Sequence, residues 1–192
     1  KNHNLSRKEV IHIMKIICSK SSLLKSVSIA LKAVPSKTTM PILECILMDA
    51  TTNQIKFTTN DMELGIETIV EGTIEEKGRV ALDAKIFYEI IRRLPDNDVT
   101  IKTDDKYAAT ITCEKAKFNI PGKSGEDFAY LPMIEKDEPL TISQYTLKEM
   151  IRQTIFSIAV NENNKLMTGE LFEIKNNCLK VVCLLYTSDA AD

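Results

Sequence analysis

Two segments of the chain carry apolar residues at helical spacing. The first runs from Lys20 to Pro35, and its apolar side chains share one helix face: Leu23, Leu24, Val27, Ala30, Leu31 and Val34. The second, residues 84–94, follows Asp83, whose carboxylate can cap a helix N-terminus. The apolar face of this second segment comprises Ile86, Phe87, Ile90, Ile91 and Leu94. A proline follows each segment, and a helix interior does not tolerate proline. The pattern therefore predicts two amphipathic helices.

Strand-like patterns fill most of the remaining sequence up to residue 120. Apolar and polar residues alternate there, and turn-forming residues interrupt the alternation. The predicted strands and hairpins are residues 14–18, 45–59 with a turn at 51–53, 62–82 with a turn at 76–78, and 98–120 with a first turn at 104–105. Two helices among antiparallel hairpins predict an α+β fold.

The pattern begins again after a charged segment. Residues 132–139 are charged and bracketed by prolines, which predicts a linker. A short strand is predicted at 140–143. A helix is predicted at 147–158, with Thr146 and Glu149 at the spacing of a capping box.

A hairpin predicted at 170–182, turning at 176–177, completes an internal repeat. Adding 124 to positions in the first segment places its apolar residues on those of the second without a gap. The matched pairs include Leu23 with Leu147, Val27 with Ile151, Ile55 with Leu179 and Phe57 with Val181. Self-similarity at one fixed offset is the signature of a repeated structural unit. The sequence therefore predicts one complete domain, residues 14–131, and the start of a second, residues 140–182.

Charge is distributed unevenly along the chain, although the net charge is only −2. Residues 14–43 contain no acid and five lysines, which are Lys15, Lys20, Lys25, Lys32 and Lys37. Residues 44–76 contain eight acids and one base, Lys56. A concentrated basic element can hold a polyanion even on an acidic protein. Charge alone leaves a second interpretation open, in which the lysines form a solvated helix face.

Candidate catalytic chemistry is sparse. Both histidines, His3 and His12, precede residue 14, which removes the usual nucleophile–base pairs and zinc ligands from the repeating body. The segment IPGKSGED, residues 120–127, resembles a phosphate loop but carries Lys117 where that loop needs glycine. We expect no catalytic residues, metal or cofactor. A small nucleotide-binding or carboxylate-based enzyme remains the alternative.

No apolar run approaches the length that spans a bilayer, so no membrane segment is expected. The five cysteines show no CxxC spacing, which is typical of reduced cysteines in a cytosolic protein.

Five segments in order carry a resemblance to a known family. They are TMPILECILM (39–48), FTTNDMELGIE (57–67), LDAKIFYEIIRRLPDND (82–98), FNIPGKSGEDFAYLP (118–132) and FSIAVNENNKLMTGELFEI (156–174). They resemble the bacterial sliding clamps, the beta subunits of DNA polymerase III, over residues 14–182. The resemblance implies clamp domains with antiparallel sheets outside and two helices each on the DNA-facing side. It also implies three such domains per protomer and two protomers in a closed ring.

The resemblance also implies site residues. Lys37 and Lys85 occupy basic DNA-contact positions of the family, and Asn161 falls at a third contact in the loop after the second-domain helix. Lys165 and Leu166 stand where some members carry aromatic DNA contacts. The strand that meets the partner protomer corresponds to Lys115, Lys117, Phe118 and Ile120.

The function that the resemblance implies is not catalytic. A sliding clamp is a processivity factor that encircles double-stranded DNA of any sequence and tethers the replicative polymerase. An ATP-driven clamp loader opens the homodimeric ring. The implied location is the bacterial cytoplasm, in association with the nucleoid.

Both ends of the chain depart from these patterns. Residues 1–13 have no counterpart in the family, and we expect them to be translated upstream sequence. The repeat and the resemblance both fail after Val182, so we expect residues 183–192 to be a tail read from a sequencing adapter. A chain that ends there lacks most of the second domain and the whole third domain. We expect it neither to close a ring nor to bind polymerase.

Overall fold

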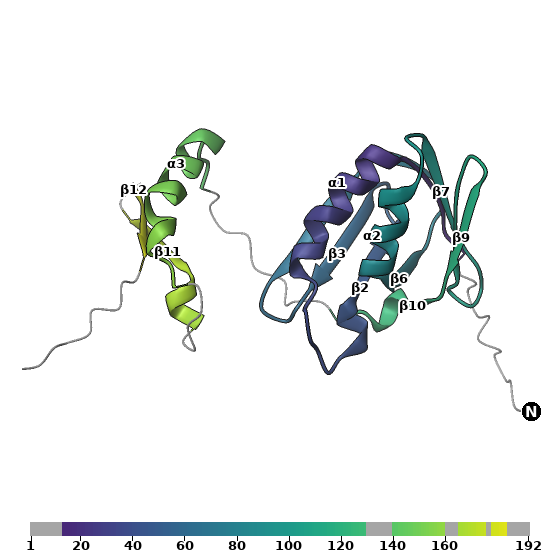
Figure 1. Ribbon diagram of the computed structural model, residues 1–192, viewed down its shortest axis with the longest axis horizontal. Helices are drawn as coiled ribbons and strands as arrows, with labels where there is room; N and C mark the ends of the chain where they lie inside the picture. Colours follow the sequence, from purple (N-terminus) through teal and green to yellow (C-terminus); the bar gives the residue numbers. More distant parts are fainter. Residues whose placement is uncertain (1–12, 130–139, 160–164, 176–177, 184–192) are drawn as a thin grey trace, which may run out of the picture. The chain divides into compact units, whose positions relative to one another are not determined.

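The computed structural model describes residues 13–129, 140–159, 165–175 and 178–183. It divides the chain into two compact units, Lys1–Met133 and Ile134–Asp192 (Figure 1). The predicted domain limits of 14–131 and 140–182 stay predictions. Residues 1–12, most of the predicted tail and the linker at 132–139 lie outside the described residues.

The first unit contains two antiparallel sheets of five strands each. One sheet has the order β5–β1–β7–β8–β9. Its strands are β1 Lys15–Ser19, β5 Gly72–Glu76, β7 Asp98–Thr103, β8 Ala109–Cys113 and β9 Ala116–Ile120. The other has the order β10–β6–β2–β3–β4. Its strands are β2 Cys45–Asp49, β3 Ile55–Asn60, β4 Gly65–Val70, β6 Arg79–Asp83 and β10 Gly122–Ser124. The hairpins predicted at 45–59 and 98–120 are confirmed, because β2 pairs with β3 and β7 pairs with β8. Residues 62–82 form strands as predicted, but the turn at 76–78 joins no hairpin, because β5 pairs with β1 and β6 pairs with β2.

The two sheets repeat one topology. The first half of the unit runs β1, helix, β2, β3, β4 and β5, and the second half runs β6, helix, β7, β8, β9 and β10. Each half places its first strand in one sheet and its next three strands in the other. The strands β4 and β9 therefore have equivalent positions, each at the end of a sheet. The sequence pattern predicted the repeat at an offset of 124 residues but not this shorter one.

Both predicted helices are present. Helix α1, Lys20–Ala30, is capped by Ser19, whose Oγ accepts a hydrogen bond from the Ser22 amide at 3.2 Å. Helix α2, Ala84–Arg93, is capped by Asp83 as predicted. The Asp83 Oδ1 accepts a hydrogen bond from the Ile86 amide at 2.8 Å. Short 3-10 turns cover Leu31–Ala33 after α1 and Pro41–Glu44 before β2. A third covers Gly125–Asp127 after β10.

The main core lies where the two helices meet both sheets. In Figure 1, α1 and α2 lie side by side over the strands, and the two helices are in contact. Helix α1 buries Leu23 and Val27 in this core, and α2 buries Phe87 and Ile91. Phe87 meets Phe57 of β3 edge to face, with ring centroids 6.1 Å apart. Burial of these side chains against a two-sheet wall holds the helices to the domain.

The chain changes sheets inside the predicted strand 62–82. Strand β4 ends at Val70 in one sheet, and β5 begins at Gly72 in the other. A Cβ atom at Gly72 would lie 2.5 Å from both the Cys18 sulfur and the Ile17 carbonyl oxygen. Glycine is therefore required where β5 closes on β1.

The second unit contains one helix and one hairpin. Helix α3 is Gln144–Thr154, the strands are β11 Glu170–Lys175 and β12 Cys178–Cys183, and 3-10 turns cover Ile155–Ser157 and Lys165–Thr168. The predicted hairpin is confirmed, because β11 and β12 pair antiparallel. Cys183, the first residue of the predicted tail, pairs with Glu170 at the end of this hairpin.

Two predictions for the second unit are wrong. The capping residue of α3 is Ser143, whose Oγ accepts a hydrogen bond from the Thr146 amide at 3.0 Å, so the helix begins before the predicted box. Residues 140–143 form no strand. A strand needs a pairing partner. The 124-residue offset places the counterparts of β5 and β7, which pair with β1, beyond Asp192.

Candidate nucleic-acid interface and subunit interface

The predicted DNA-contact residue Lys37 lies between two 3-10 turns that connect α1 to β2. Its side chain is exposed. It takes part in no ion pair with the residues that the structure describes. An exposed ammonium without a carboxylate partner can approach a phosphate without first breaking an ion pair.

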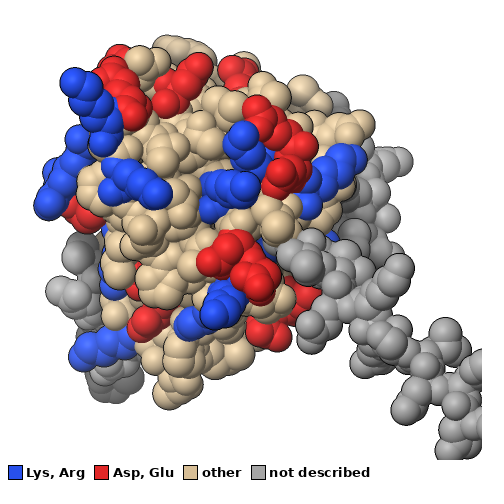
Figure 2. Space-filling view, turned by 90° about the vertical axis from the view of Figure 1, so that its right-hand side faces the viewer, with Lys and Arg blue, Asp and Glu red and all other residues tan. Residues whose placement is uncertain are grey.

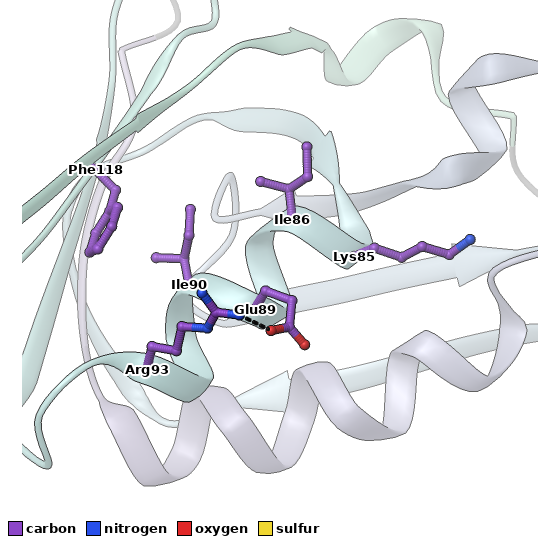
Figure 3. A pocket seen from close by; sticks show the side chains of 6 residues that line it. All are labelled: Lys85, Ile86, Glu89, Ile90, Arg93 and Phe118. Atoms are coloured by element: carbon purple, nitrogen blue, oxygen red, sulfur yellow. Dashed lines mark hydrogen bonds and ion pairs between the residues drawn. The ribbon is translucent and has the colours of Figure 1, made fainter.

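The second predicted DNA contact, Lys85, lies in the first turn of α2. The Asp83 cap fixes where this turn begins and so sets the direction of Lys85. The Lys85 side chain is exposed, and Figure 3 shows it extending away from the other labelled side chains. The ammonium is therefore open to a partner.

The next turns of α2 form one wall of a groove, and β9 forms the other. The groove has a volume of about 320 Å³ and is lined by Lys85, Ile86, Glu89, Ile90, Arg93 and Phe118. Phe118 stands opposite Ile90 in Figure 3. Phe118 is 39% exposed and Ile86 is 49% exposed, so two large apolar side chains meet solvent in one groove.

Strand β9 ends its sheet, so one of its edges has no neighbour among the described strands. An open edge beside exposed apolar side chains is a template for pairing with another chain. The predicted interface residues Lys115, in the turn before this strand, and Lys117, within it, are both exposed. Ile120 lies on the same strand, with a side chain that is 6% exposed and packs in the core. Nothing in the structure tests these residues as interface contacts, and they stay predictions.

Charge in the groove is balanced within α2. Glu89 accepts hydrogen bonds from Arg92 at 2.7 Å and from Arg93 at 3.2 Å. The hydrogen bond from Arg92 is the main reason that the pKa of Glu89 is lowered from its ordinary value. These two arginines are therefore paired, whereas Lys85 on the same helix is not.

The face of the molecule beside β7 and β9 carries charges of both signs. Figure 2 shows this face, which is the right-hand side of Figure 1, with basic and acidic side chains interspersed. A mixed surface of this kind creates no strong attraction for a polyanion.

The segment that resembles a phosphate loop has another role. Residues Gly122–Ser124 form β10 and pair with β6, and the Lys123 ammonium donates a hydrogen bond to the Pro41 carbonyl at 3.1 Å. A Cβ atom at Gly122 would lie 2.2 Å from the Tyr107 carbonyl oxygen, so the glycine serves close packing. A phosphate loop presents free amides at the start of a helix, and only a three-residue 3-10 turn follows here. The geometry does not support nucleotide binding at this segment.

The structure offers no other chemical centre in the parts of the chain that it describes. No three His, Cys, Asp or Glu side chains gather there in a way that could hold a metal ion. No described helix is both long and apolar enough to cross a membrane.

The predicted second-unit contacts are placed only in part. Asn161 lies outside the described residues. The backbone of Lys165 and Leu166 opens the 3-10 turn before β11. Nothing in the structure tests these three as DNA contacts, and they stay predictions.

Two groove residues, Ile86 and Ile90, were missed as candidate site residues. The helical pattern placed both on the buried face. Ile90 is partly buried against the core, but Ile86 is 49% exposed. A signal was present in the sequence. The adjacent apolar pairs at 86–87 and 90–91 make the apolar stripe wider than packing against one core requires.

Comparison with known proteins agrees with this geometry. Residues 14–132 match the family model of the DNA polymerase III beta subunit, N-terminal domain. The chain belongs to the DNA polymerase III beta subunit family. The matched residues coincide closely with the first unit, which places both sheets, both helices and the groove inside the family domain.

Individual members of this family cover more of the chain. The beta sliding clamp of Bacillus subtilis is 35% identical over 172 residues, which are 85% of this chain and 46% of that protein. The beta sliding clamp of a Synechocystis species is 35% identical over 164 residues, 81% of this chain and 42% of that protein. The chain therefore spans about half the length of these relatives.

Solved structures of the family confirm the fold. A protein of Eubacterium rectale described as a DNA polymerase III beta subunit is 68% identical, with a TM-score of 0.84. The sliding clamp of Bacillus subtilis is 33% identical, with a TM-score of 0.81. Each comparison covers 90% of this chain and 47% of the other chain. The predicted fold, clamp domains of antiparallel sheets with two helices in the complete domain, is confirmed.

Proposed function

We propose that this chain supplies the first domain, and the start of the second, of a sliding clamp that encircles duplex DNA and holds a polymerase to it. The observation that carries the proposal is the open edge of β9 beside the apolar groove. In a ring made from two chains, the domains on either side of a subunit boundary are not covalently linked. Each of them therefore needs a surface that binds the other.

In this proposal, the groove binds a domain of the partner protomer that presents the edge of a sheet. Phe118, Ile86 and Ile90 would lose their exposed surface on association, and Lys115 and Lys117 would lie at the rim. Exposed aromatic side chains in a shallow pocket are typical centres of protein interfaces. Ile120 belongs to the same strand as Phe118, and in this proposal its backbone is part of the β9 edge.

The DNA-facing side in this proposal is the helical side. Lys37 lies in the connection from α1 to β2, and Lys85 lies in α2. Both are exposed and form no ion pair with the described residues. Contacts of this type go to phosphates, so they hold duplex DNA without selecting a sequence.

The proposed role needs no catalytic residue in this chain. A closed ring remains on DNA because it is topologically linked, so retention does not depend on tight binding. The replicative polymerase and the loader that opens the ring are the proposed partners of the whole protein, and the bacterial cytoplasm is its proposed location. The alternative role as a nucleotide-binding enzyme loses its main support, because the GKS segment is a sheet strand.

A chimaera tests the proposal. Residues 14–132 of this chain replace the matching domain of the Bacillus subtilis beta sliding clamp, and the product is loaded on a nicked circular DNA. We expect retention on the circle and release within minutes once the circle is cut, because the link is topological. Equal release from circular and linear DNA by a folded dimeric chimaera would refute the proposal.

A matched pair of variants tests the subunit interface in the same chimaera. Phe118→Asp should convert the dimer to monomers, because a carboxylate cannot enter an apolar interface without a partner. Thr52→Asp, an exposed position in the β2–β3 turn, is the control and should remain dimeric. A dimeric Phe118→Asp protein would show that the groove is not the interface.

A further inference from the structure

Two of the four strands that end a sheet in the first unit carry exposed apolar side chains. The end strands are β5 and β9 in one sheet and β10 and β4 in the other. Ile69 of β4 is 58% exposed and Phe118 of β9 is 39% exposed, whereas no large apolar side chain of β5 or β10 is exposed. An open edge with exposed apolar side chains is a template for pairing with another chain. The first unit therefore has two candidate joining surfaces.

Each of these two strands lies beside a helix, with a hollow between strand and helix. The hollow beside β9 is the groove that α2 lines. The hollow beside β4 has a volume of about 210 Å³ and is lined by residues of α1 and β4, among them Ile29, Thr68 and Ile69. Ile29 is 40% exposed, and the Thr68 hydroxyl is buried without a hydrogen-bond partner among the described residues. A buried hydroxyl normally has a partner, so this surface is incomplete by itself.

We name the two surfaces by their strands. The β4 end comprises Ile29, Thr68, Ile69 and Glu71. The β9 end comprises Ile86, Phe118 and the two lysines Lys115 and Lys117.

The two ends carry opposite charge along their strands. Residues 61–71 contain no base and four acids, which are Asp61, Glu63, Glu67 and Glu71. Residues 115–120 contain no acid and two bases, Lys115 and Lys117. Glu67 is paired with Lys56 at 2.9 Å, whereas Glu71 and both lysines are exposed and form no ion pair with the described residues.

This charge pattern selects among the possible pairings of edges. Two β4 ends would bring acids together, and two β9 ends would bring lysines together, and like charges across paired strands are destabilising. A β4 end against a β9 end instead places Glu71 among lysines and covers Ile69 with the apolar groove. Both surfaces that this contact needs are present on the same chain.

We infer that this chain associates with a second copy of itself, the β4 end of one copy against the β9 end of the next. The inference rests on the proposed subunit interface for the β9 end, and it adds a second surface and an identical domain as its partner. The contact is heterologous, because each copy contributes a different surface. Every dimer therefore keeps one unused end of each kind, and association continues past the dimer.

Two variants of the whole 192-residue chain, each with one end disabled, test the inference. Ile69→Asp places a carboxylate in the β4 end, and Phe118→Asp places one in the β9 end, where an apolar contact would leave it without a partner. Thr52→Asp, in the exposed β2–β3 turn, adds the same charge away from both ends and is the control. Sedimentation velocity measures the mass over a concentration series into the millimolar range, and circular dichroism checks that each variant keeps its secondary structure.

The unaltered chain and the control should exceed the mass of a dimer as concentration rises. Each disabled variant alone should remain a monomer of 21.6 kDa. An equimolar mixture of Ile69→Asp and Phe118→Asp should form a dimer and stop there, because the mixture contains one intact end of each kind. A chain that carries both substitutions should neither associate alone nor join the mixture.

Four results would overturn the inference. One is an unaltered chain that stays monomeric at every concentration. Another is Ile69→Asp that still associates alone, since two β9 ends would then suffice. A third is association that persists in both variants, which would place the contact elsewhere, for example in the second unit. The fourth is a mixture that forms no dimer, which would show that the two ends do not match.

Reversal of charge tests the electrostatic part of the argument. Lys115→Glu with Lys117→Glu should raise the dissociation constant by about tenfold or more, because like charges would then face Glu71. Lys115→Arg with Lys117→Arg is the matched control and should associate like the unaltered chain, since arginine keeps the charge. Unchanged association after charge reversal would overturn the pairing of β9 with the acidic strand.

These results are separate from the test of the ring. Retention of the chimaera on circular DNA depends on topology, and its subunit contact does not use the β4 end of this domain. A monomeric unaltered chain would therefore overturn the self-association and leave the chimaera result unaffected. Equal release from circular and linear DNA would refute the ring and leave the mixing experiment to decide the self-association.

Discussion

Replacement of Phe87 by alanine tests whether the core holds α2 in place. This side chain is fully buried and meets Phe57 of β3 edge to face at 6.1 Å. Deletion of a buried phenylalanine ring costs about 3–5 kcal/mol, which combines lost burial with the cavity left behind. Small domains are stable by only about 5–15 kcal/mol, so the variant should lose a large part of its stability.

The assay is urea unfolding followed by far-ultraviolet circular dichroism. Ile86→Ala is the matched control, because it lies on the same helix but is 49% exposed. It should cost about 1 kcal/mol or less, since little burial is lost and alanine favours helix. A cost below about 1 kcal/mol for Phe87→Ala would refute the packing of α2 on β3.

A double-mutant cycle isolates the ring contact itself. Phe57→Leu and Phe87→Leu are measured singly and together. The coupling free energy should be about 0.5–1.5 kcal/mol, the range for aromatic pairs beyond their burial. Additive effects would show that the two rings pack in the core without a specific contact.

Three further outcomes follow from local geometry. Asp83→Ala should destabilise the domain by about 1 kcal/mol in the same urea assay, because the first turn of α2 loses its cap; an unchanged midpoint would exclude the cap. Glu89 should titrate below the ordinary glutamate range by NMR, and Arg92→Ala should raise its pKa. Because the folded pKa of Glu89 is depressed, its stabilising effect is present above the unfolded pKa and is lost as pH falls through the folded pKa. Burial raises the pKa of the Cys18 thiol to about 12, so at pH 8 iodoacetamide should label exposed Cys178 and spare Cys18, which mass spectrometry can check.

Local signals in the sequence predicted the elements that local physics determines. The cap at Asp83 and both helices of the first unit follow from side chains next to the backbone that they satisfy. The cap of α3 was misplaced because two hydroxyl residues, Ser143 and Thr146, stand at competing positions, and both can cap a helix. Choice between them depends on where the chain enters the helix, which the pattern does not encode.

The pairing of strands that lie far apart in the sequence was harder to predict. The alternation at 62–82 correctly indicated strands, but the change of sheet between β4 and β5 depends on partners far along the chain. The candidate site shows the same limit. Lys37, Lys85 and Phe118 came from the resemblance, whereas the exposure of Ile86 depends on how α2 is rotated over the core.

In the proposed ring, the matching positions of β4 and β9 would give the first unit two joining ends. Each is the last strand of its sheet, and the internal two-part topology makes the two ends alike in backbone arrangement. In polymer terms such a unit is a bifunctional monomer. A chain of bifunctional units closes into a circle when the rotation from one unit to the next divides a full turn evenly, and otherwise grows into an open fibre. The angle between the two edges, rather than the strength of either joint, then decides which product a string of such units makes.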